Sequence, residues 1–348
     1  MVKHCSLWRS GTLALVVTFL LMNSALHGQK VASTSFQFLK VVPSARGAAL
    51  GEAYSVWATG AEAAFWNPAG LARVQRVEFF STYVDWLFDA QQGALAVAMP
   101  LRRLGAVAAQ LQYVDFGEFE ETSTARPYIN NPEHPGFTGR TFRPFACVVG
   151  VAYARDLTDK FTVGLGAKYA YQSLFSEKEV TAMVRAGVYQ EVKTWAGGVL
   201  FDFGIRYNTG YRSIHLGSAV QNFGANVKFA KESHPVPLLF RFGLGADLVG
   251  RDGLLVSGSE DQRLGIVADV FHPNDYDQQL HLGGEYEFSG LLALRCGYKF
   301  NYDFDGLTLG AGLKCAVGGL ALSLDWSYGD MGTYLGNVQR ISVSMSLP

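Results

Sequence analysis

Long hydrophobic runs are missing from most of this 348-residue chain. After residue 28, no uncharged apolar stretch approaches the roughly 20 residues that a membrane-spanning helix needs. Charge of one sign is not concentrated either, because residues 29–348 carry 27 Lys and Arg against 30 Asp and Glu. Nucleic-acid binding requires a concentrated basic face, so no nucleic-acid partner is expected.

Cysteine is scarce and scattered: only Cys147, Cys296 and Cys315 follow residue 28. An odd number at irregular spacing is not a disulfide framework. Cys296 and Cys315 are placed symmetrically about a predicted turn near Asp305, so we expect them to face each other on neighbouring strands. A disulfide between them is one interpretation, and two free thiols facing lipid is the favoured one.

Signatures of catalysis are also missing. No serine lies in a Gly-x-Ser-x-Gly context, and the sequence therefore predicts no enzyme. Three histidines precede proline in predicted loops, namely His134, His234 and His272. A metal site is conceivable there, but proline commonly interrupts loops, so we expect neither a metal nor another cofactor.

The first 28 residues have the pattern of a secretory signal peptide. Lys3 and Arg9 give a positive start, an apolar run covers 11–22, and small and polar residues follow up to Gly28. We therefore expect an exported protein.

The remaining chain is rich in apolar residues and glycine, and from Val77 onward apolar residues alternate with small or polar ones. In residues 291–301, Leu294, Cys296 and Tyr298 fall on one face, opposite Arg295 and Lys299. This period of two, in segments of about 10 residues, is typical of transmembrane β-strands. The pattern predicts an all-β, 14-stranded antiparallel transmembrane barrel over residues 77–348. Its strands are expected at 77–87, 89–100, 104–115, 144–154, 161–174, 196–207, 212–222, 238–249, 262–272, 278–288, 291–303, 306–317, 319–329 and 337–347.

The predicted connections support this fold. Most of those on one side are short, whereas the other side holds the long segments 116–143, 175–195, 223–237 and 330–336. That sorting is typical of outer-membrane barrels, which have short periplasmic turns and long extracellular loops. Residues 178–192 are left open as a further hairpin or a short helix. Trp86, Trp195, Trp326 and Tyr328 are expected in the aromatic girdle.

Charged residues of both signs share the inferred inward face of the strands. Because Lys or Arg costs about 2–4 kcal/mol on the lipid face at the bilayer midplane, we place the charged residues in the lumen as pairs. The lumen set comprises Lys168, Asp202, Arg206, Arg241, Asp247, Asp269, Glu285, Glu287, Arg295, Lys299, Lys314 and Asp325. Several glycines share this face, Gly164 and Gly297 among them, and glycine permits close packing against the inner wall.

Residues 29–76, before the first strand, are expected to form that packing partner as a plug. The segment is rich in Ala and Gly and shows little alternation. Ser44 is suited to cap a short helix over 45–52, and Pro68 keeps Asn67 out of the helical region, which predicts a turn. Arg46 or Glu52 is expected to meet the charges of the lumen.

Residues 44–72 resemble the N-terminal signature of the PorV/PorQ family, which is related to FadL-type barrels. The resemblance is carried by Ala45-Arg46, Leu50-Gly51 and the run Trp66-Asn67-Pro68-Ala69-Gly70-Leu71-Ala72. It implies an outer-membrane barrel with a plug and a role in type IX secretion. The implied partners are other secretion components and secreted proteins with C-terminal signal domains.

Three functions follow as hypotheses. The first is an accessory role in type IX secretion, in which cargo or the cell-surface attachment complex binds the long loops. The second is FadL-like transport of hydrophobic small molecules, which needs an apolar cavity. The third is a structural barrel. In each case the outer-membrane lipid surrounds the protein.

Overall fold

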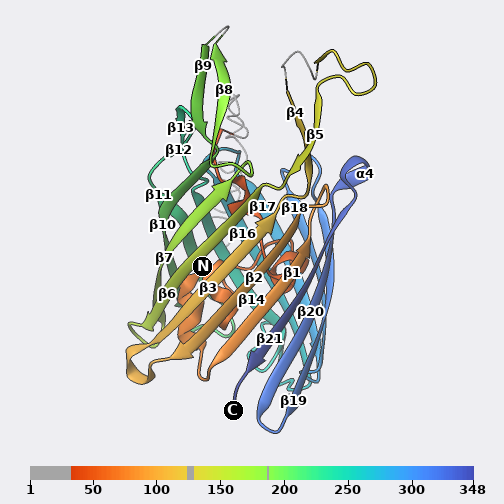
Figure 1. Cartoon of the computed structure of the whole chain (residues 1–348). Coiled ribbons are helices and arrows are strands. Elements are labelled where there is room, and N and C mark those ends of the chain that lie inside the picture. Colours follow the sequence, from red (N-terminus) through yellow and green to blue (C-terminus); the bar gives the residue numbers. More distant parts are fainter. Residues whose placement is uncertain (1–32, 124–128, 186–187) are drawn as a thin grey trace, which may run out of the picture. The chain divides into compact units, whose positions relative to one another are not determined.

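Fourteen antiparallel strands close into a barrel (Figure 1). The computed structural model describes residues 33–123, 129–185 and 188–348, so the predicted signal peptide lies outside the described residues. The ring is closed where β1 pairs with β21 and where β11 pairs with β14. Each strand overlaps one predicted range, which confirms the 14-stranded barrel. The strands are β1 (Glu78–Asp85), β2 (Gln91–Pro100), β3 (Ala106–Asp115), β6 (Phe145–Asp156), β7 (Phe161–Ser173), β10 (Trp195–Asn208), β11 (His215–Gly224), β14 (Leu239–Gly250), β16 (Gln262–Pro273), β17 (Gln279–Phe288), β18 (Leu292–Phe300), β19 (Leu307–Val317), β20 (Leu320–Asp330) and β21 (Asn337–Ser346).

The two faces of the strands differ as the alternation predicts. In β18, Leu294 and Tyr298 are exposed on the outside, whereas Arg295 and Lys299 are buried on the inside. The same contrast runs around the barrel, so that the outer surface is a band of large apolar side chains. Such a band matches the hydrocarbon core of a bilayer. No helix in the described part of the chain is long and apolar enough to cross a membrane.

The two ends of the barrel carry different connections. One end has mostly short turns, extended by η4 (Arg102–Leu104) and by the two-residue β15 (Val256–Ser257). The other end carries three hairpins and the short helix α4 (Gly332–Leu335) (Figure 1). By barrel topology this end is extracellular. Its hairpins are β4 (Phe119–Thr122) with β5 (Phe137–Phe142), β8 (Glu179–Arg185) with β9 (Val188–Lys193), and β12 (Val227–Phe229) with β13 (Glu232–His234). The segment left open at 178–192 is therefore a hairpin.

The prediction that Cys296 and Cys315 face each other on neighbouring strands was wrong, because the strands pair in a different register. Cys296 lies opposite Leu309, and Cys315 pairs across to Leu322 on β20. The turn between β18 and β19 is shifted from the predicted centre, which moves the two cysteines apart along the strands. Both are free thiols on the exposed outer face.

The segment before β1 lies inside the barrel. It folds into short helices, namely η1 (Gln37–Lys40), α2 (Ala45–Ala49), η2 (Ala61–Phe65) and η3 (Pro68–Arg73). Ser44 Oγ accepts a hydrogen bond from the Gly47 amide and so caps α2. Positive φ angles at Gly51 and Glu52 end this helix at the wall of the barrel. We call residues 33–76 the plug.

Candidate functional site: plug, lumen charges and extracellular cavity

The plug sits on glycines of the inner wall. A Cβ atom on Gly297 would lie 2.0 Å from the Gly51 nitrogen, and one on Gly164 would lie 2.2 Å from the Ala69 nitrogen. Both clashes involve backbone atoms, which cannot rotate away. The inward glycines thus let the backbone of the plug touch the backbone of the strands.

The Asn67-Pro68 turn attaches the second half of the plug to β10. The Asn67 side chain accepts a hydrogen bond from the Ala69 amide and donates to the carbonyls of Ser55 (2.9 Å) and Ile205 (3.1 Å). Position 70 requires a glycine, because a Cβ atom there would lie 2.0 Å from the Ala58 carbonyl oxygen. Trp66 is buried beside this turn. These residues of the signature therefore form the turn and its contacts with β10 and with the rest of the plug.

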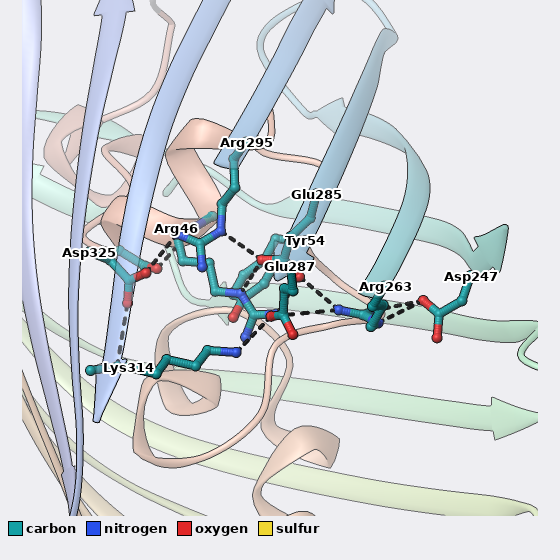
Figure 2. Close-up of polar contacts among 12 residues, drawn as sticks. Arg46, Tyr54, Asp247, Arg263, Glu285, Glu287, Arg295, Lys314 and Asp325 are labelled. Carbon is teal, nitrogen blue, oxygen red and sulfur yellow. Dashed lines mark hydrogen bonds and ion pairs between the residues drawn. The ribbon is translucent and has the colours of Figure 1, made fainter. Parts of the chain in front are cut away.

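The carboxylate of Glu285 binds three arginines between the plug and the wall (Figure 2). Glu285 is fully buried and accepts hydrogen bonds from Arg46 (2.8 and 3.0 Å), Arg263 (2.8 Å) and Arg295 (2.6 Å). Three flanking acids add negative charge: Arg295 also contacts Asp325, and Arg263 contacts Asp247 and Glu287, the last of which also pairs with Lys314. We call this set the Glu285 cluster. Arg46 is its one member from the plug.

A second charged residue of the plug, Glu52, lies nearer the extracellular end and lines the cavity described below. Its carboxylate contacts Lys299 (2.7 Å) and Arg241 (3.5 Å). Lys299 also contacts Asp305 in the β18–β19 loop. Both plug charges named from the sequence therefore meet charged residues of the wall.

The remaining predicted lumen charges are spread around the wall. Lys168 forms an ion pair with Asp202 at 2.7 Å. Asp202 also accepts a hydrogen bond from the backbone amide of Asn222, at a bulge between β10 and β11. Asp269 accepts from the Tyr54 and Ser55 amides of the plug. Lys314 contacts Glu287 at 2.6 Å. Arg206 faces inward, and its Nε and one terminal nitrogen are buried without a hydrogen-bond partner in the described part of the chain.

The Glu52 contact predicts an acid-sensitive plug. Burial alone raises the pKa of Glu52, but Lys299 and Arg241 outweigh it and lower this pKa to about 2. Because the pKa of Glu52 is lower in the folded protein than its ordinary value of 4.5, the ionised carboxylate stabilises the folded state at pH values above 4.5. That stabilisation is lost as the pH falls toward 2. The loss is on the order of 3 kcal/mol. We expect ion conductance through purified protein in planar bilayers to rise between pH 4.5 and pH 2.

The control is Glu52→Gln, which has no carboxylate to titrate at this position. Its conductance should be raised already at pH 7 and should change less on acidification. A wild-type conductance that stays flat down to pH 2 would contradict the expectation.

A cavity of about 650 Å³ opens above the plug at the extracellular end. The plug contributes part of its floor through η1 and Glu52, and the β1–β2 turn, β3, β16 and the β18–β19 loop form the walls. Most of the lining is apolar and much of it is aromatic. The aromatic residues are Phe38, Trp86, Phe88, Phe116, Phe119, Phe271, Tyr276, Tyr302 and Phe304. Trp86 was expected in the girdle, but it faces this cavity and stacks beneath Arg340.

Gln92, Gln279 and Tyr302 line the cavity, and His281 and Asp275 lie beside lining residues; the sequence interpretation gave none of them a role. Gln92, Gln279 and His281 are buried on inward faces of β2 and β17, so the alternation that placed Glu285 inward would also have found them. Tyr302 and Asp275 lie in loops, where alternation gives no signal. Asp275 accepts from Thr34 (2.7 Å) and Gln37 (2.9 Å) and so fixes the start of the plug.

Within the described residues, no group of three or more His, Cys, Asp or Glu is arranged to hold a metal ion. His134 and His234 lie in extracellular loops, and His272 lies at the end of β16.

Comparison with known proteins rests on structure. No family model matches the sequence, and a search of curated proteins finds no match. The Pseudomonas putida toluene transporter TodX is similar in fold, with a TM-score of 0.54 and 14% identity over 86% of this chain and 95% of that one. The monoaromatic hydrocarbon channel CymD gives a TM-score of 0.51 and 12% identity over 90% and 98%. A Pseudomonas aeruginosa FadL homologue aligns over 92% and 99% with a TM-score of 0.48 and 14% identity. The chain thus has the fold of TodX and CymD, and its closed barrel with an apolar outer band is that of a Gram-negative outer-membrane protein.

Proposed function

We propose that the protein carries small hydrophobic molecules across the outer membrane. The observation that carries this proposal is the apolar cavity at the extracellular end, which lies directly above the plug. Its volume of about 650 Å³ and its apolar lining with a few polar groups are those of small-molecule sites. The fold shared with TodX, a toluene transporter, and with CymD, a monoaromatic hydrocarbon channel, adds support.

Capture in this cavity would be the first step of transport. Aromatic side chains at its opening, such as Phe88 and Phe304, are exposed to solvent and can take an apolar molecule out of water. Below the cavity the plug fills the described lumen, with Tyr54 and Trp66 buried against the wall. Passage therefore requires plug residues to move.

A variant that fills the cavity tests the proposal. Ala90 lines the cavity at the start of β2, so Ala90→Trp should occupy part of it. We expect uptake and binding of a hydrophobic probe such as toluene to fall by about tenfold, which corresponds to about 1.4 kcal/mol. The measurements are probe accumulation by cells that produce only this barrel and probe binding to the detergent-purified protein.

Leu95→Trp is the matched control, because Leu95 is on the same strand but faces lipid. It should leave both measurements at the wild-type value. Wild-type uptake and binding in Ala90→Trp would count against capture in this cavity.

The second candidate is an accessory role in type IX secretion, which rests on the resemblance of residues 44–72. The extracellular hairpins favour it as a surface for protein binding. The rings of Phe119 and Phe142 stack there with centroids 5.8 Å apart, Phe175 is tilted against Phe142 at 4.5 Å, and Phe119 is exposed. Aromatic residues are enriched at the cores of protein interfaces.

Deleting the gene separates the two candidates. Accumulation in the periplasm of proteins with type IX signal domains would favour the secretion role. Normal secretion together with impaired uptake of a hydrophobic compound would favour the transporter.

A further inference from the structure

The polar groups of the extracellular cavity are concentrated on one wall. Lys299 contacts both Glu52 and Asp305, and its ammonium lies 5.3 Å from the ring of Tyr302. The Tyr302 hydroxyl is 2.9 Å from His281 Nε2, and Gln279 precedes His281 by two residues on the same inward face of β17. We call Glu52, Gln279, Tyr302 and Asp305 the polar strip. All four line the cavity.

The strip contains hydrogen-bond acceptors that lack partners. Asp305 Oδ1 and Gln279 Oε1 are buried and have no hydrogen-bond partner among the residues that the structure describes. Gln92, on the wall across the barrel, has neither amide atom satisfied and is also almost fully buried. An unsatisfied buried polar group costs about 1–3 kcal/mol. A small rotation that lets such a group meet a ligand would recover this free energy.

The charges that line the cavity disfavour an anion. Three acids contribute to the lining, Glu52, Asp303 and Asp305, against one cation, Lys40. Lys40 is already paired with the buried Asp275. Two cations, Lys299 and Arg241, lie beneath Glu52, and both are likewise in contact with acids. A carboxylate brought into this cavity would lose its hydration and meet carboxylates in the lining. Arg340 has no ion pair with an acid of the described residues, but it is not part of the lining: it packs on the Trp86 ring and donates to the Val42 carbonyl.

We propose that the cavity selects neutral hydrophobic molecules whose polar end donates a hydrogen bond, such as alcohols, over carboxylates. The apolar and aromatic walls hold the hydrocarbon part, and the acceptors of the polar strip bind the hydroxyl. This inference rests on the proposed function, since it specifies which hydrophobic molecules the cavity takes.

Three ligands with the same ten-carbon chain test the selectivity. 1-Decanol has a donor, its methyl ether has none, and decanoate is an anion at pH 8. We expect decanol to bind the purified full-length protein about tenfold more tightly than the ether, as one hydrogen bond predicts, and decanoate to bind most weakly. Isothermal titration in detergent, corrected for partition of each ligand into micelles, gives the three affinities.

Two variants assign the effect to the polar strip. Asp305→Asn removes a lining charge and keeps the side-chain shape, so the disadvantage of decanoate should shrink by about tenfold. Lys40→Met removes the lining cation and should not weaken decanoate binding. Circular dichroism and the heat-dependent mobility of the barrel in SDS gels establish that both variants are folded.

The outcomes separate this inference from the proposed function. If decanoate binds as tightly as decanol, or loses its binding in Lys40→Met, the selectivity is wrong while uptake through the cavity stands. If the methyl ether equals decanol, the donor has no role and the inference is overturned. If none of the three ligands binds, both the inference and the proposed function fail.

Discussion

Replacing Glu285 by glutamine is expected to release the first half of the plug and open the barrel to ions. Glu285 is the shared acceptor for Arg46, Arg263 and Arg295. Removing one partner of a buried ion pair costs about 3–5 kcal/mol, because a charge is left buried and uncompensated. The strands have continuous hydrogen-bonded neighbours on both sides, so the barrel should survive while the plug does not. Planar-bilayer conductance and hydrogen exchange of residues 45–58 measure the release.

Two further variants make this prediction specific. Glu287→Gln neutralises a nearby acid that is partly exposed and contacts Lys314, so its conductance should stay close to wild type. Arg46→Met removes only the plug's member of the Glu285 cluster and should loosen the plug without leaving the wall arginines in excess. A wild-type conductance in both Glu285→Gln and Arg46→Met would show that the cluster does not hold the plug.

The barrel could be predicted from the sequence because its physical cause is local and repeated. Each strand has one face toward lipid and one toward the lumen, so side chains such as Leu294 and Arg295 report their own environment. The same alternation indicates which charges face inward. It does not indicate which acid each arginine meets, because Arg46 and Glu285 are 239 residues apart.

The extracellular cavity could not be predicted from the sequence, for a related reason. Its residues come from the plug, from strand ends and from loops, and several of them, such as Phe304 and Tyr276, follow no period. Trp86 illustrates the error that results. A tryptophan at the end of a strand is typical of the lipid interface, yet the β1–β2 turn directs this one inward.

The N-terminal signature carries less functional information than its length suggests. Gly51 has a positive φ at the wall, Asn67 bonds the β10 backbone, and Gly70 lies against the Ala58 carbonyl. In this protein these residues hold the plug against the inside of the barrel, a role that does not depend on what the barrel carries. The resemblance to the PorV/PorQ family therefore predicts the plug more directly than it predicts type IX secretion.

Gly297→Ala is expected to displace the plug by steric exclusion alone. The new Cβ would lie 2.0 Å from the Gly51 nitrogen and 2.2 Å from the Leu50 carbonyl carbon. These are backbone atoms, so residues 50 and 51 have to shift, and Glu52 beside them loses its position against Lys299. Overpacking of this kind costs about 1–3 kcal/mol, to which the weakened ion pair adds. Conductance should rise at pH 7 and lose part of its acid dependence, because the Glu52 contact is already disturbed.

Gly284→Ala is the matched control in the neighbouring strand. Its Cβ would point to the outside, where the nearest heavy atom is 3.8 Å away, so the substitution adds a methyl group without a clash. Alanine is no worse than glycine inside a strand, and both variants should therefore assemble as barrels. If Gly297→Ala conducts no more than Gly284→Ala, the contact between Gly297 and the plug does not close the lumen. An increase only in Gly297→Ala means that this closure depends on backbone contact as well as on the ion pairs of Glu52 and Arg46.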